Sequence, residues 1–284
     1  MHRKILTVIV LILVWLVPAA AARAADETKR LDVGVKEADA SLHDSWFGMY
    51  SHEQKIGFLH EAVDKVTEDG RTFYRKRAQA QIKLMALGEK GEINIDSSLY
   101  FAARPPFALL SGEHISDDGA SKKRVSLVAR GSGYQATVTV GKHTRTSTLS
   151  DLSFTLADVV SPTLWLKRRP ARGETITVAD FDVGELYLGK TALKLVATKE
   201  VVQGGVKMMV SEVEKIEYQA RSKDVSLVRF DSDARVVSSL VAGAFDLRRE
   251  SEADARKTEF SKDMIFENMA KLDRAVGDLP SVTA

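Results

Sequence analysis

Alternation of apolar and polar residues with a period of two is the feature that most constrains how this chain can fold. In one segment every second residue is apolar: Ala78, Ala80, Ile82 and Leu84. The residues between them are polar, and residues 134–140 repeat the pattern. Successive side chains of a β-strand point to opposite faces of a sheet, so this spacing predicts strands with one buried face and one wet face.

Turn-forming residues separate these segments at short intervals. They lie at residues 68–70, 88–91, 117–119, 131–133, 204–205 and 231–233. Regular spacing of strand and turn is typical of an antiparallel meander rather than of alternating strands and helices. The pair Gly204 and Gly205 suits the positive φ angles of a tight hairpin turn, and it predicts two long paired strands on either side.

One segment has helical spacing instead. Apolar residues recur at helical intervals from Leu156 to Leu164, and Thr155 with Asp158 has the pattern of a capping box. We expect a short helical insertion near residues 155–168 that plugs the open side or end of a curved sheet, with a mobile lid as the alternative. The predicted fold is therefore all-β. It is a large curved antiparallel sheet, either a half-barrel or a sandwich-like meander, with this insertion and a C-terminal tail.

The first residues have the pattern of an export signal. Arg3 and Lys4 precede a thirteen-residue apolar run at residues 5–17, and residues 22–24 (Ala-Arg-Ala) fit a cleavage site. A helix that crosses a bilayer needs about 20 apolar residues, so this run is too short for a membrane anchor. We therefore expect cleavage after Ala24 and a periplasmic or secreted protein with no stable membrane anchor.

Net charge and length limit the classes of partner and the domain organisation that can be expected. Removal of the leader takes away Arg3, Lys4 and Arg23, so the 41 basic residues become 38 against 39 acidic ones. Domains that bind DNA or RNA usually carry a basic patch, so we expect no nucleic-acid partner. The predicted parts are a signal peptide (1–24), a polar lead-in (25–44), an antiparallel β-domain (45–250) and a C-terminal helix or connector tail (251–284).

Known catalytic and metal-binding patterns do not occur. The absence of cysteine excludes disulfides, a thiol nucleophile and thiolate metal ligands. His52 and His60 lie eight residues apart in a strand-like region, not four apart on one helix as in zinc peptidases, so we expect surface or edge histidines. Glu212 and Glu214 are interpreted as acids on the wet face of a strand rather than as a glycosidase pair. No serine-hydrolase elbow, Walker loop or dinucleotide fingerprint is present, so we predict a non-enzyme without catalytic, cofactor-binding or metal-binding residues.

The segment WFGMYSHEQKIGFLHEAV at residues 46–63 resembles the first hairpin of the β-domain that precedes the catalytic domain in bacterial transglutaminase-like exported proteins. The matching positions are Trp46, Gly48, Tyr50, Lys55, Ile56, Gly57 and Phe58. The segments VRFDSDARVVSS and GAFDLRRES resemble the closing strands of that domain, and KLDRAVGDLPSVTA is similar to its connector. The Cys-His-Asp catalytic domain of the family is missing, so the resemblance implies the module without the activity.

The function expected from these observations is an exported, non-catalytic binding or accessory module. Its partner would be a protein or a peptide-like ligand, and a transglutaminase-like domain is one such partner. The candidate residues are Trp46, Tyr50, Phe58 and Trp165, as core or groove-lining side chains, and Gly57, as a site of close backbone approach. A periplasmic carrier that holds a lipid or lipoprotein acyl chain in a half-barrel cavity is the alternative, and an unmarked hydrolase is a third reading. No cofactor is expected.

Overall fold

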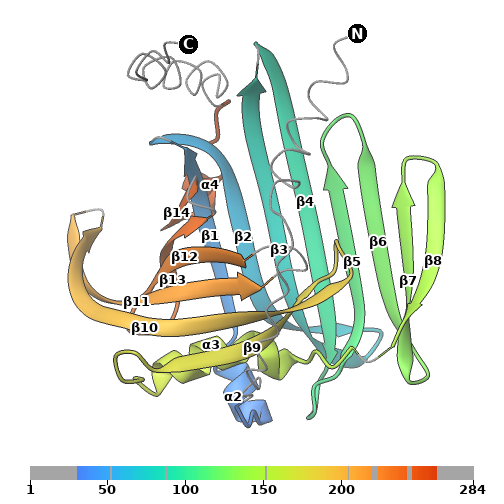
Figure 1. Ribbon diagram of the computed structural model, residues 1–284, viewed down its shortest axis with the longest axis horizontal. Helices are drawn as coiled ribbons and strands as arrows, with labels where there is room; N and C mark the ends of the chain where they lie inside the picture. The colour runs from blue at the N-terminus through green and yellow to red at the C-terminus, as the bar shows by residue number, and fades with distance from the viewer. Residues whose placement is uncertain are drawn as a thin grey trace, which may run out of the picture.

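The computed structural model describes residues 31–260 except 52, 87, 151, 204, 219–222 and 242–244. The predicted signal peptide, His52 and the tail beyond residue 260 lie outside the described residues. Fourteen strands in the described part form one antiparallel sheet (Figure 1).

The first meander comprises the first eight strands of the chain, each hydrogen-bonded to the next. Their bounds are β1 (His43–Ser51), β2 (Gln54–Glu68), β3 (Arg71–Ala86), β4 (Glu89–Ala102), β5 (Leu109–Asp117), β6 (Lys122–Arg130), β7 (Gly133–Val140) and β8 (His143–Leu149).

The second meander comprises the last six strands, again paired in chain order. They are β9 (Thr175–Asp182), β10 (Tyr187–Gln203), β11 (Val206–Tyr218), β12 (Lys223–Phe230), β13 (Val236–Val241) and β14 (Phe245–Glu250). The last strand pairs with the first, with Trp46 opposite Glu250. This pairing joins the two meanders into one sheet with β1 and β14 near its centre.

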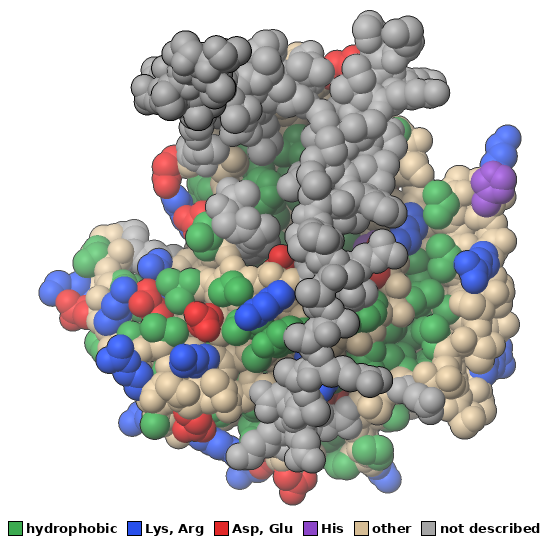
Figure 2. All heavy atoms as spheres, in the orientation of Figure 1, with side chains coloured by type: hydrophobic (Ala, Val, Ile, Leu, Met, Phe, Trp, Pro, Cys, Tyr) green, Lys and Arg blue, Asp and Glu red, His purple; other side chains and the backbone are tan. Residues whose placement is uncertain are grey.

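The sheet curls so that the second meander runs across the first (Figure 1). We call its concave side, which carries Phe47, Leu99 and Val228, the inner face. Phe181 and Val183, at the end of β9 and in the turn after it, share a buried core with Leu99 and other inner-face residues of β4–β7. Figure 2 shows hydrophobic side chains gathered on the inner face of β5–β7 and charged side chains of both signs along the outer face of β10 and β11. Among the described strands, β8 and β9 end the sheet without pairing with each other, so it stays open.

Short helices complete the described part: α2 (Val35–Asp39), α3 (Leu156–Lys167) and α4 (Glu252–Ala255). The backbone N–H of Thr155 donates to the Asp158 carboxylate at 2.9 Å, which is one half of the predicted capping box at the start of α3. In Figure 1, α2 and α3 lie together at one end of the curled sheet, and α4 follows β14. None of the described helices is long and apolar enough to span a membrane.

The predicted fold class is confirmed. The chain is all-β with one antiparallel meander sheet, and the helical insertion expected near residues 155–168 is α3. A single curled sheet corresponds to the half-barrel rather than to a sandwich of two sheets. The predicted hairpin at Gly204 and Gly205 is also confirmed, because β10 and β11 pair antiparallel and Gly205 has a φ angle of 80°.

Candidate functional site

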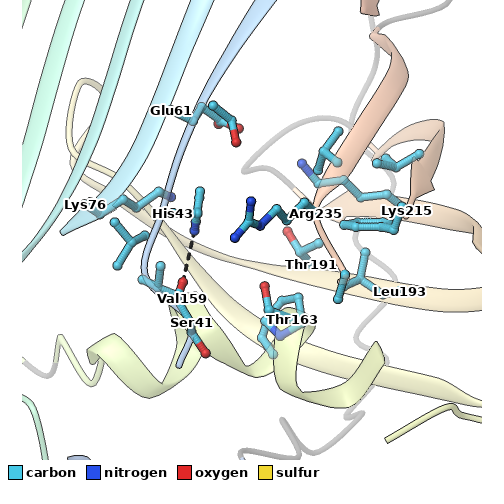
Figure 3. A pocket seen from close by; sticks show the side chains of 18 of the residues that line it. Ser41, His43, Glu61, Lys76, Val159, Thr163, Thr191, Leu193, Lys215 and Arg235 are labelled. Atoms are coloured by element: carbon cyan, nitrogen blue, oxygen red, sulfur yellow. Dashed lines mark hydrogen bonds between the residues drawn. The ribbon is translucent and has the colours of Figure 1, made fainter. Parts of the chain in front are cut away.

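The curl of the sheet forms a partly open cavity of about 670 Å³ between the two meanders. The inner faces of β1–β3 form one wall, the inner faces of β9–β14 form the other, and α3 lies across one end (Figure 3). Much of the wall is apolar. The apolar side chains include Phe47, Leu59, Val63, Val178, Leu193, Val228, Phe230, Val236 and Leu247.

Charged side chains interrupt this apolar wall at Lys215, on the inner face of β11. The Lys215 ammonium lies 2.8 Å from the Glu217 carboxylate. Burial works against the charge of Lys215, but Glu217, Asp180 and Glu61 outweigh it and hold the pKa of the amine above its ordinary value. Lys215 therefore stays protonated at neutral pH, which suits electrostatic binding and not nucleophilic catalysis.

A second polar group lies on the opposite wall and beside the helix. His43, Val63 and Lys76 form one row across β1, β2 and β3. The Nδ1 atom of His43 lies 3.1 Å from the Ser41 carbonyl oxygen, so Nδ1 carries the proton and donates this bond. Figure 3 shows Lys76 and Arg235 extending into the cavity from its two sides.

The sequence-predicted aromatic residues lie on the other side of the sheet. Trp46, Tyr50 and Phe58 belong to the outer face of β1 and β2, and none of them lines the cavity. The rings of Trp46 and Phe58 are 5.7 Å apart, and the Arg256 guanidinium lies 4.4 Å from the Trp46 ring centre. These residues pack the segment after β14 onto the outer face.

Glu250 connects several of the residues on which the sequence resemblance rests. Both the Tyr50 hydroxyl and the Lys55 ammonium donate to the Glu250 carboxylate. Gly48 leaves room for this carboxylate, because a Cβ atom at Gly48 would lie 2.8 Å from its oxygens. Burial raises the pKa of Tyr50, and the bond to Glu250 raises it further. The first hairpin and the closing strand thus form the joint between β1 and β14.

The remaining predicted residues, Gly57 and Trp165, also lie outside the cavity lining. Gly57 pairs with Ile82 of β3, and a Cβ atom there would lie 2.1 Å from the backbone oxygen of Gln81. Trp165 is buried on α3 in the core with β9–β12, and its indole N–H donates to Glu174 at 3.1 Å.

The expectation of a surface histidine is wrong for His60. Its side chain is buried, because it stacks on Trp46 with ring centres 4.0 Å apart. Its Nε2 atom lies 3.0 Å from the Asp44 carboxylate. In the part of the chain that the structure describes, no three His, Asp or Glu side chains are grouped as metal ligands.

The interpretation of Glu212 as a wet surface acid is also wrong. Glu212 is only 7% exposed, and its two carboxylate oxygens lie 2.9 Å from Lys199 and 2.9 Å from Arg229. Burial would raise the pKa of Glu212, but the bonds to these two cations outweigh it and hold the pKa below its ordinary value. Glu212 is therefore a structural ion-pair centre on the outer face.

We expect Glu212→Gln to lower the free energy of unfolding by about 1 kcal/mol at neutral pH, because both cations lose a charged acceptor. A folded-state pKa below the unfolded one stabilises the protein above the unfolded value and loses this effect as pH falls through the folded value. The difference from the parent should therefore shrink below about pH 4.5, the ordinary pKa of the group. Urea unfolding at neutral pH and at a pH below about 4.5 measures the difference in free energy of unfolding. Glu214→Gln is the matched control, and equal losses at both pH values would contradict the prediction.

The charged residues of the cavity were not predicted from the sequence. A signal was present, because Lys76 continues the apolar alternation of Ala78 and Ala80, and Lys215 continues that of Val213. A charged residue at a core-facing position of a strand needs a partner or a ligand. Alternation alone places such residues inward but does not show that strands from two meanders bring them together.

Comparisons with known proteins add a fold-level likeness. No family model matches the chain, and no curated protein matches it. The structure is similar to a solved structure described as a beta-barrel-like protein of the domain of unknown function DUF1849 from Brucella abortus, with a TM-score of 0.48 and 10% sequence identity. The match covers 74% of this chain and 95% of that one. The resemblance to transglutaminase-associated modules therefore stays a prediction.

Proposed function

We propose that the protein is an exported, non-catalytic binding protein whose cavity holds a small ligand with a substantial apolar part. The observation that carries this proposal is the cavity of about 670 Å³ between the meanders. Ligand sites are typically about 300–1,000 Å³, mostly apolar, with a few convergent polar groups. The export signal supports a place in the periplasm or outside the cell.

The accessory role beside a transglutaminase-like domain is a second proposal. It is supported by the sequence resemblance of residues 46–63. It requires that this chain form a complex with such a domain. Separate elution of this protein and such a domain in size-exclusion chromatography would contradict the second proposal.

Filling the cavity should abolish binding of an apolar ligand. Ser226 lies on the inner face of β12, opposite Lys215, and it lines the cavity. We expect Ser226→Trp to weaken binding of the apolar dye N-phenylnaphthylamine by about tenfold or more, because the indole occupies the space that the dye needs. Isothermal titration calorimetry measures the change.

The neighbouring residue provides a matched control. Val225 precedes Ser226 on the same strand but is 52% exposed on the outer face. Val225→Trp should bind the dye as the parent does. If the two variants bind equally well, the dye does not use the cavity and the proposed function fails.

A further inference from the structure

Two cations face the cavity from opposite walls without a carboxylate partner. Lys76 extends from β3 and Arg235 from the loop that starts β13, and their charged ends point toward each other in Figure 3. Among the described residues, no ion pair joins either side chain to an acid. Arg235 is exposed and Lys76 is partly buried, so both charged ends are accessible to an anion that enters the cavity. An anion between them would be attracted by both cations.

The position of Arg235 is fixed by its own loop. The Asp231 carboxylate accepts the backbone N–H groups of Asp233 and Arg235, each at 3.0 Å. The other oxygen of Asp231 accepts from Arg249 at 2.8 Å. Asp231 is thus occupied in holding the loop, and the Arg235 guanidinium remains directed into the cavity (Figure 3).

Lys76 is fixed by the sheet. It pairs with Val63 on one side and with Leu99 on the other, both buried apolar residues of the inner face. The nearest strand position with a carboxylate on this wall is Glu61, and its charge acts on Lys215. Three of the cavity acids, Glu217, Asp180 and Glu61, act on Lys215. No ion pair between described residues joins Lys76 or Arg235 to an acid, so both remain available to an external partner.

A further donor lies beside the two cations. His43 is not that donor, because its Nδ1 atom donates to the Ser41 carbonyl and the Nε2 atom of a neutral ring is an acceptor. The Thr163 side chain reaches the same region from α3 (Figure 3). An ammonium, a guanidinium and a hydroxyl form the kind of donor set that binds carboxylate or phosphate oxygens.

We infer that the cavity binds an amphiphile with an anionic head group, a carboxylate or a phosphate monoester, held between Lys76 and Arg235. Its apolar part would lie along Leu193, Val228 and Phe230. This inference rests on the proposed function, because it names the ligand class of the same cavity. The guanidinium offers two parallel N–H donors to the head group, and the lysine adds a point charge from the opposite wall.

The test compares dodecyl probes that carry different head groups, together with inorganic phosphate. Dodecanoate and dodecyl phosphate, below the concentrations at which they form micelles, should bind the mature protein about tenfold or more tightly than dodecanol, as charged hydrogen bonds require. Inorganic phosphate should bind far more weakly than dodecyl phosphate, since it lacks the apolar part. Isothermal titration calorimetry measures all four.

Variants test whether Lys76 and Arg235 cause the preference for anionic probes. Lys76→Gln combined with Arg235→Gln should remove the preference for the anionic probes and leave dodecanol affinity within about twofold. The charge-conserving pair Lys76→Arg and Arg235→Lys should keep part of the preference, which separates charge from folding. The control pair is Lys142→Gln with Arg145→Gln, two exposed cations in and after the turn between β7 and β8 that do not line the cavity.

The possible outcomes distinguish failure of the anionic head-group inference from failure of the proposed cavity-binding function. Equal affinity for dodecanol and dodecyl phosphate, or a preference that survives the double glutamine variant, would overturn the anionic head group while leaving a cavity binder. Equal affinity for free and dodecyl phosphate would show a plain anion site and overturn the amphiphile. Failure of every probe to bind would contradict the proposed function itself.

Discussion

Replacing Phe181 with alanine is expected to lower the free energy of unfolding by about 3–5 kcal/mol, the range for a large aromatic residue in a core. Phe181 is 4% exposed, and its ring lies 5.9 Å from that of Phe154, which lies 5.8 Å from Phe101. This chain of rings attaches the end of β9 to the inner face of the first meander. Without the Phe181 ring, a void replaces the contact that keeps the sheet curled. Urea unfolding followed by tryptophan fluorescence measures the loss.

The same variant has a functional readout. Because Phe181 holds β9 in place and β9 contributes Val178 to the cavity wall, Phe181→Ala should also weaken dye binding in conditions where the protein remains folded. Phe181→Leu keeps most of the side-chain volume and should lower stability by only about 1 kcal/mol. If alanine and leucine have equal effects, the ring contacts do not hold the two meanders together.

Gly57→Ala should have the next largest effect, a loss of about 3 kcal/mol, the upper range for overpacking. A Cβ atom at this position would lie 2.1 Å from the backbone oxygen of Gln81, and a paired strand cannot move away without breaking its hydrogen bonds. The strain falls on β2 and β3, which build one wall of the cavity. Thermal unfolding by circular dichroism measures it.

Gly48 is the matched control in the same hairpin. The three heavy atoms nearest to a Cβ atom there would all belong to the carboxylate of Glu250, at the far end of a flexible side chain. Gly48→Ala should therefore lower stability by about 1 kcal/mol, because Glu250 rotates away and loses part of its bonding to Tyr50 and Lys55. A loss as large as that of Gly57→Ala would show that the distinction between backbone and side-chain neighbours does not hold here.

The strands and the helix could be predicted from the sequence because their signals are local. Alternation with a period of two, glycine-rich turns and a capping pattern at Thr155 each act over a few residues. They identified the hairpin of β10 and β11 and the position of α3. They carry no information on which strands from distant parts of the chain become neighbours, so the pairing of β1 with β14 could not be derived from them.

The candidate site was less predictable for the same reason. The aromatic residues of the opening hairpin attract attention in the sequence, yet Trp46, Tyr50 and Phe58 lie on the outer face. Which face of a strand becomes concave depends on the curl of the whole sheet. Lys76 and Arg235 face the same cavity only through that curl, since they belong to different meanders. A search for charged residues at core-facing positions would have found Lys76 and Lys215. It would not have shown that the two residues line the same cavity.

We expect the joint between β1 and β14 to form late in folding. Tyr50 and Glu250 are 200 positions apart, and contacts between such distant residues form slowly because a long loop must close first. Until then, each of the two strands has a free edge that can pair with another molecule. Refolding is thus a competition between closure within one chain and association between chains, and its yield should fall as the protein concentration rises. The carboxylate of Glu250 helps to decide that competition, since only the native register places it beside Gly48 and within reach of Lys55.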